Sequence, residues 1–169
     1  IQNRDGEKFS ELSKIIGESY FNTQQYDKAL KYLKNYSGKN GKWTNVDFYQ
    51  LGYAYYETGS YSEAIDQFSK IIGKKDKLAQ NAYYYLAECY LKKDRKSSAL
   101  NAYRSAASMS FNQEISQTAL LNYARLSYEI GNPYEKVPKV IIKYLETYPK
   151  TSNKQELTAM LLSSYTNSG

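Results

Sequence analysis

The stretch FYQLGYAYYETGSYSEAIDQF, residues 48–68, decides the fold predicted for this chain. Apolar and aromatic residues recur at helical spacing on both sides of the turn ETGS (57–60), which predicts two helices joined as a hairpin. Gly52 lies inside the first of these helices, where a glycine costs about 1 kcal/mol relative to alanine. We therefore expect Gly52 to mark a place where two helix backbones pack closely, not a break in the helix.

The same pattern occurs 35 residues earlier, in LSKIIGESYFNTQQYDKALKYL (12–33), and 35 residues later, in NAYYYLAECYLKKDRKSSALNAY (81–103). Gly17 and Ala87 take the place of Gly52 in these copies. A repeat of this length indicates a stack of helix hairpins, in which each unit buries part of its apolar face against its neighbours.

A fourth copy spans about residues 116–149, and a fifth starts at residue 153 and stops after one helix. If Tyr128 takes the place of Tyr90 in the fourth copy, the spacing there is 38 residues, and Tyr165 follows 37 residues later. The turns inside the hairpins are predicted at 22–25, 57–60, 92–95 and 130–133.

Two helix starts can also be predicted. Thr44 and Asp47 have the spacing of a capping box, in which each side chain bonds the backbone N–H of the other residue. Pro138 has no backbone N–H to donate, so the second helix of the fourth unit should begin close to it.

A helix hairpin of 33–38 residues with this pattern resembles the tetratricopeptide repeat, TPR. The residues that carry the resemblance in the second unit are Phe48, Leu51, Gly52, Tyr55, Tyr61, Ala64 and Phe68. The resemblance covers roughly residues 9–169, although Ser13 replaces the first aromatic in the first unit and Lys96 replaces the turn tyrosine in the third. It implies an all-α fold, a right-handed superhelical solenoid of TPR helix hairpins with about four and a half repeats.

The resemblance divides the chain into a single TPR solenoid domain, residues 9–169, and an N-terminal segment, residues 1–8. The units are expected at about 9–43, 44–78, 79–115 and 116–151, with a partial unit at 153–169. Because no second helix follows the partial unit, we expect the natural protein to continue with further repeats.

The composition argues against an enzyme. The chain has no histidine and a single cysteine, so the commonest general acid–base group is missing and no internal disulfide can form. No phosphate-binding glycine loop or nucleophile elbow is present, and the carboxylates form no recognisable pair. We therefore expect a non-catalytic protein with no cofactor, no metal and no small-molecule substrate. No apolar run is long enough for a membrane span, so we expect no direct membrane insertion by this segment.

In the TPR family the first helices of the hairpins line a concave groove that binds a peptide or an extended segment of a partner. The resemblance therefore implies a protein–protein interaction scaffold. The candidate groove residues are those on the first helices that the packing pattern does not use: Lys14, Glu18, Phe21, Tyr49, Tyr53, Tyr56, Tyr84, Glu88, Lys92, Asn122 and Arg125.

Four of these residues are predicted to form an aromatic patch. Tyr49, Tyr53 and Tyr56 have the spacing of one helix face, and Tyr84 follows Tyr49 by 35 residues and should lie beside it. Tyrosine offers a large contact area at a low entropy cost, which suits recognition. The alternative is that these tyrosines only reflect a chain with 20 tyrosines in 169 residues. A position of Trp43 at the rim would favour the binding patch.

A chaperone-type TPR clamp for a C-terminal carboxylate does not fit the sequence. Lys14 stands where the first lysine of such a clamp is needed, but Glu18 and Tyr84 stand where Asn and Lys are needed. Glu88 takes the place of the arginine and would repel a carboxylate.

The alternative function is that of a nucleic-acid-associated helical-repeat protein, in which basic residues contact phosphates and aromatic rings stack on bases. The basic residues available for this role include Lys39, Lys42, Lys74, Lys75, Lys77, Lys92, Lys93, Arg95 and Lys96. Most of them lie at predicted turns and linkers, where solvated charge is ordinary, so the net charge of +6 favours a soluble surface over a nucleic-acid site. A third possibility is a segment that only spaces other domains.

The stretch IIKYLETYPKTSNKQELTAMLL (141–162) joins a helix ending in Tyr-Pro to the next helix through a polar linker. This arrangement resembles repeats of bacterial envelope TPR proteins, namely the lipoprotein BamD of outer-membrane-protein assembly and YbgF, the coordinator of the Tol-Pal system. The resemblance implies a part of a larger envelope protein with a periplasmic or outer-membrane-associated location. A cytoplasmic location is the alternative.

Overall fold

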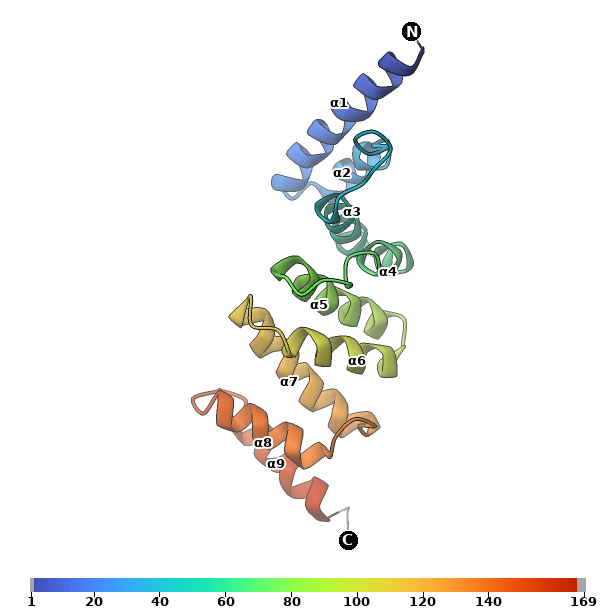
Figure 1. The fold of residues 1–169 in the computed structure, drawn as a ribbon. Coiled ribbons are helices and arrows are strands. Elements are labelled where there is room, and N and C mark those ends of the chain that lie inside the picture. Colours follow the sequence, from blue (N-terminus) through green and yellow to red (C-terminus); the bar gives the residue numbers. More distant parts are fainter. Residues whose placement is uncertain (1, 167–169) are drawn as a thin grey trace.

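The computed structural model describes residues 2–166, with side chains from residue 5 onward, and this part of the chain forms nine α-helices. They are α1 (Gln2–Asn22), α2 (Tyr26–Leu33), α3 (Asn45–Glu57), α4 (Tyr61–Phe68), α5 (Lys77–Lys92), α6 (Lys96–Ala107), α7 (Gln113–Ile130), α8 (Val137–Thr147) and α9 (Lys154–Thr166). Figure 1 shows an elongated stack with α1 at one end and α9 at the other. Residue 1 of the predicted N-terminal segment and residues 167–169 of the predicted partial unit lie outside the described residues.

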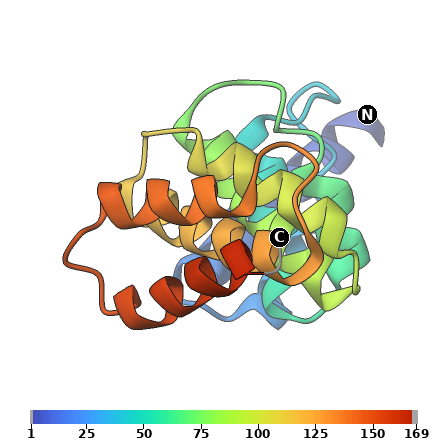
Figure 2. The same ribbon diagram turned by 90° about the horizontal axis from the view of Figure 1, so that it is seen from below.

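The helices pack as hairpins of consecutive helices, which confirms the all-α prediction. The first helices of the hairpins are α1, α3, α5 and α7, and the second helices are α2, α4, α6 and α8; α9 packs on α8 as the first helix of a further unit. Figure 2 looks along the long axis of the stack and shows that successive helix hairpins are rotated relative to one another.

The first three hairpins turn in the same way. Three residues separate the helices in each case, and the middle residue of each turn has a positive φ: Gln24 at 58°, Gly59 at 78° and Asp94 at 53°. These turns lie where the sequence predicts them.

The turn of the fourth hairpin is longer than predicted. Gly131, with φ 79°, ends α7, and α8 begins only at Val137, with Pro138 in its first turn. Asn132 organises the intervening loop, because its Oδ1 accepts hydrogen bonds from the backbone N–H groups of Tyr134 and Glu135. The prediction that a helix begins close to Pro138 is therefore confirmed, while the predicted four-residue turn at 130–133 was wrong.

The close approach predicted at the glycines is confirmed. A Cβ atom built on Gly52 would lie 3.0 Å from Cε1 of Phe68 and 3.1 Å from Cβ of Gln67, both on the partner helix. A Cβ atom on Gly17 would lie 2.8 Å from Cγ of Leu33. Ala87, the equivalent residue in the third unit, is fully buried. In the first three units, a small residue thus lies at the same repeat position of the first helix, where that helix packs on its partner.

The buried residues of α7 align the fourth unit with the third at a spacing that is one residue shorter than predicted. Tyr123 and Ala124 are buried as Leu86 and Ala87 are in α5, so the spacing between the third and fourth units is 37 residues. Ser127, which is fully buried, therefore takes the place of Tyr90. Tyr128, which was predicted to occupy that place, is exposed.

The first helices lie on the inner side of the stack. Each of them contacts the next first helix, from α1 to α3 and onward to α9, whereas within the described residues no contact joins one second helix to the next. In a curved stack with two rows of helices, the row whose helices lie closer together is on the inner side of the curve. The first helices α1, α3, α5 and α7 therefore lie on the side of the stack where the sequence predicts a groove.

The close approach at Gly52 predicts a clear difference between two glycine substitutions. Gly52→Val should lower the free energy of unfolding by about 2 kcal/mol, because the branched side chain would overlap Phe68 and Gln67. Gly6→Val, on α1 where nothing lies within 4 Å of the added Cβ, should change it by less than about 0.5 kcal/mol. Urea unfolding followed by circular dichroism measures both, and equal effects would contradict the packing role.

Candidate functional site

The inner face at α3 and α5 carries a group of aromatic rings that we call the tyrosine cluster. It consists of Phe21, Tyr26, Tyr49, Tyr53, Tyr56, Tyr84 and Tyr85, all of them half-buried. Tyr53 lies at its centre, with ring centroids 5.8 Å from Phe21, 5.5 Å from Tyr26 and 6.1 Å from both Tyr49 and Tyr56. The structure therefore brings together Phe21 and the three tyrosines predicted on α3.

Tyr85 belongs to the cluster although sequence reasoning missed it. Its ring centroid lies 4.9 Å from that of Tyr53, 6.4 Å from that of Tyr49 and 5.3 Å from that of Tyr84. Tyr85, not Tyr84, thus contacts Tyr49. The reason is geometric: equivalent residues of successive helices point in the same direction, so a contact between the helices uses different positions. Its counterpart in the second unit is Gln50, which gave no aromatic signal in the repeat comparison.

The hydroxyl groups of the cluster meet two carboxylates. Burial raises the pKa of Tyr53, and a hydrogen bond to Glu57 raises it further. Burial and the negative charge of Glu88 also raise the pKa of Tyr84, and they raise the pKa of Tyr56 to about 12. Tyr53, Tyr56 and Tyr84 therefore remain neutral hydrogen-bond donors at physiological pH.

Glu88 lies at the centre of the stack. It accepts a hydrogen bond from the hydroxyl of Tyr103, a fully buried residue of α6 whose hydroxyl also lies beside Asn122 of α7. The hydrogen bond from Tyr103 holds the carboxylate of Glu88 in place. The same carboxylate lies close enough to Tyr84 and Tyr56 for its charge to act on both hydroxyl groups. This part of the inner face therefore combines aromatic rings with negative charge.

Lys14, another predicted groove residue, forms an ion pair within the molecule. Its Nζ lies 2.6 Å from Oδ1 of Asp47 at the start of α3 and 4.8 Å above the ring of Tyr36. Asp47 also completes the predicted capping box, since Thr44 N donates to its Oδ2 at 2.7 Å and its own N–H donates to Thr44 Oγ1 at 3.3 Å. Lys14 therefore joins the first unit to the second, with Glu18 3.9 Å away.

Arg125 has the equivalent role at the other end of the stack. Its Nε and Nη2 donate to the two carboxylate oxygens of Glu156 at 2.8 and 2.6 Å, and Nη2 also donates to Asn153 Oδ1 at 3.0 Å. This bidentate pair joins α7 to α9. Lys92, the last residue of α5, is exposed. Among the charged groove candidates, Glu88 is the one that the structure places against the tyrosine cluster.

Trp43 does not lie at the rim of the tyrosine cluster. Its ring centroid lies 5.5 Å from that of Tyr36 and 5.3 Å from that of Phe48, on another side of α3. Its position gives no added support to the predicted patch.

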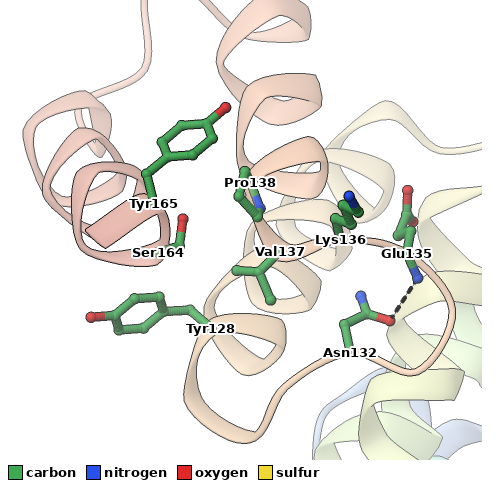
Figure 3. A pocket seen from close by; sticks show the side chains of 8 residues that line it. All are labelled: Tyr128, Asn132, Glu135, Lys136, Val137, Pro138, Ser164 and Tyr165. Atoms are coloured by element: carbon green, nitrogen blue, oxygen red, sulfur yellow. Dashed lines mark hydrogen bonds between the residues drawn. The ribbon is translucent and has the colours of Figure 1, made fainter. Parts of the chain in front are cut away.

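A second candidate site is a cavity of about 580 Å³ near the end of α9. It is lined by Tyr128, Asn132, Glu135, Lys136, Val137, Pro138, Ser164 and Tyr165. Figure 3 shows Ser164 and Tyr165 on one side and Val137 and Pro138 on the other. The lining offers space for an apolar side chain with charged groups at the edge. No sequence signal marked it, because it depends on the register shift of Tyr128 and on the long loop before α8.

Residues 2–166 contain no group of three or more His, Cys, Asp or Glu side chains that could hold a metal ion. Over the same residues, no helix combines the length and apolarity needed to cross a membrane. Cys89 is fully buried, and burial raises the pKa of its thiol to about 12. Its thiol is therefore protonated at neutral pH and is a packing group, not a nucleophile.

These hairpins, with a small residue at each helix contact and an inner face of first helices, define a TPR-type solenoid, and a tetratricopeptide-repeat model matches residues 15–39. The chain belongs to the family described as regulator of microtubule dynamics protein 1-3, whose model matches residues 35–131. Both families consist of non-catalytic scaffolds, and TPR repeats generally bind protein segments. The resemblance to bacterial envelope proteins receives no support from these matches.

A solved structure has the same fold. It is the crystal structure of a Podosopora anserina protein described as a kinesin light chain with nearly identical TPR-like repeats. The superposition has a TM-score of 0.61 and covers 92% of this chain and 84% of that one, at 12% sequence identity. At this identity the likeness concerns the fold alone. No curated protein sequence matches the chain.

The ion pair of Lys14 and Asp47 predicts a pH-dependent stability. Burial opposes ionisation of Asp47, but the hydrogen bonds from Lys14 and Thr44 outweigh it, so its pKa lies below the usual value of 3.8. The pair therefore stabilises the fold above about pH 4, and its contribution is lost as the pH falls through the lowered pKa. Asp47→Asn should cost about 1–2 kcal/mol at pH 7, because Lys14 is partly exposed, and this difference from wild type should shrink towards pH 3.

Urea unfolding at several pH values between 7 and 3 measures this difference. Glu129→Gln removes the exposed ion pair with Lys96 and serves as the control, with a cost at pH 7 that should be far below that of Asp47→Asn. A cost of Asp47→Asn that stays constant down to pH 3 would contradict the assignment.

Proposed function

We propose that this chain is a non-catalytic interaction scaffold in the regulation of microtubule dynamics, and that it binds an extended segment of a partner protein along the tyrosine cluster. The observation that carries this proposal is the cluster itself: seven half-buried aromatic rings and two carboxylates on the inner face of a TPR-type solenoid. Tyrosine-rich surfaces with rigid rings bind partners at a low entropy cost.

The rings of the cluster hold each other in place. Tyr85 packs edge-on against Tyr53 with an interplanar angle of 86°, and the ring centroid of Tyr85 lies 5.9 Å from that of buried Phe68. A surface ordered before binding loses little conformational freedom when the partner arrives. Central, partly desolvated aromatic residues are also the residues that dominate binding energies in measured interfaces.

The charge of the groove supports a partner segment with basic side chains. Two carboxylates, those of Glu57 and Glu88, border the tyrosine cluster, although the whole chain has a net charge of +6. Lys14 and Arg125 are already paired with Asp47 and Glu156. An arginine or lysine of the partner that enters between Glu88 and the tyrosine rings would gain both a carboxylate contact and a cation–π contact.

The link to microtubules comes from the family to which the chain belongs. A role in microtubule regulation accords with the cytoplasmic alternative, and it leaves no reason for the periplasmic location that the linker at 141–162 implied. We therefore propose a cytoplasmic protein.

The effect of the chain on tubulin polymerisation tests this function. Purified tubulin, followed by turbidity with and without the full chain, should polymerise at a different rate when the chain is present. Tyr53→Ala should weaken the interaction by about 2 kcal/mol, which corresponds to roughly thirtyfold, because Tyr53 lies at the centre of the cluster. Tyr134→Ala, at an exposed tyrosine outside the cluster, should leave the effect unchanged.

Two results would count against the proposal. A wild-type chain without influence on polymerisation at any concentration tested would remove the microtubule role. Equal behaviour of Tyr53→Ala and Tyr134→Ala would remove the tyrosine cluster as the binding surface.

A further inference from the structure

We infer that the chain has a binding site apart from the tyrosine cluster and the cavity near α9, and that it takes an acidic segment of a partner protein with an apolar side chain at its centre. The site is a cleft of about 450 Å³ between the 34–44 linker, α3 and α4, which we call the Trp43 cleft. It is lined by Lys34, Gly41, Trp43, Phe48, Leu51, Tyr55, Gln67 and Lys70. The face of α3 that carries Leu51 and Tyr55 differs from the face that carries the tyrosine cluster, so this site does not rest on the proposed groove function.

An ordered linker forms one wall of the cleft. Residues 34–44 fold back in a tight turn, with a bridge between Lys39 and Lys42 and positive φ angles of 88° at Gly38 and 73° at Gly41. A Cβ atom at Gly38 would lie 2.6 Å from the backbone C of Lys42, so the turn requires glycine there. This linker, at 11 residues, is longer than those that join the later units. Extra residues between repeats are often located on a binding face.

Two lysines stand at the mouth of the cleft. Lys34 Nζ lies 5.3 Å from the ring centroid of Tyr55, and Lys70 Nζ lies 4.9 Å from that of Phe48. Lys70 also donates to Gln67 Oε1 at 3.0 Å, and within the described residues neither lysine is paired with a carboxylate. The acidic group that faces this region is Glu63, whose charge acts on Tyr55. The cleft thus presents two ammonium groups against one carboxylate.

The distribution of charge along the chain strengthens this complementarity. The 34–44 linker contains three lysines and no acidic residue, and the 69–76 linker contains three lysines and one aspartate. Both linkers border the cleft, whereas the first helices carry an excess of acidic residues. The outer cleft and the inner groove therefore favour partners of opposite charge.

The ring geometry favours a protein segment over a nucleic acid. A base binds by stacking on an open aromatic face. The ring of Trp43 is stacked on Phe48 at an interplanar angle of 26° and packs against Tyr36, while the lysines cover the rings of Phe48 and Tyr55. The rest of the lining is largely apolar, with Trp43, Phe48, Leu51 and Tyr55, and suits an aliphatic or aromatic side chain. Carboxylates on both sides of that side chain would reach Lys34 and Lys70.

The fluorescence of Trp43 provides a direct test, because it is the chain's single tryptophan. The probe is a synthetic peptide of glutamates with one central phenylalanine, titrated into the full chain. We expect a saturable change in Trp43 emission, and at least fivefold weaker binding when the phenylalanine of the peptide is replaced by serine. Lys70→Glu should weaken binding at least tenfold, since it places a carboxylate at the mouth of the cleft.

Lys143→Glu is the matched control, because it makes the same change of charge at an exposed residue of α8 outside the cleft. Circular dichroism checks that both variants are folded, and Lys34→Gln supplies a second, milder variant with an expected loss of about threefold. The inference is overturned if the peptide causes no saturable change, or if Lys143→Glu weakens binding as much as Lys70→Glu. It is also overturned if a single-stranded oligonucleotide of equal charge binds at Trp43 more tightly than the peptide.

Discussion

The close contact between the two helices of each hairpin is the constraint on which the structure depends. At Gly17, Gly52 and Ala87 the first helix touches its partner through a residue with little or no side chain. This contact determines the distance and orientation within the hairpin. Because a single hairpin leaves apolar surface on both sides, the next unit must cover it, and the stack follows from repetition of the same contact.

Stacking of this kind separates the surface into two regions with different chemistry. The first helices approach each other on the inner side, where tyrosine rings and the carboxylates of Glu57 and Glu88 gather. The second helices do not contact each other, so clefts such as the one at Trp43 open between them, bordered by lysine-rich linkers. A chain with a net charge of +6 can thus present an acidic groove and a basic cleft.

Much of the fold was predictable because the repeat is local. The hairpins, three of the four turns, the small residues at the helix contact and the capping box of Thr44 and Asp47 all depend on residues close in sequence. Most members of the tyrosine cluster were found in the same way, since Tyr49, Tyr53 and Tyr56 share one face of a single helix. Tyr26 and Tyr85 were missed, because their contacts with Tyr53 join different repeat positions on neighbouring helices.

The sequence by itself determined the helix hairpin, its repetition, the absence of the usual catalytic groups and the face of α3 on which three tyrosines lie. Only the tertiary structure decided which side chains meet across units: Tyr85 with Tyr53, Lys14 with Asp47, and Arg125 with Glu156. It also decided that Trp43 belongs to an outer cleft and not to the groove. The physical reason is that helical periodicity defines directions around one helix, whereas contacts between helices depend on the angle and distance at which successive units pack.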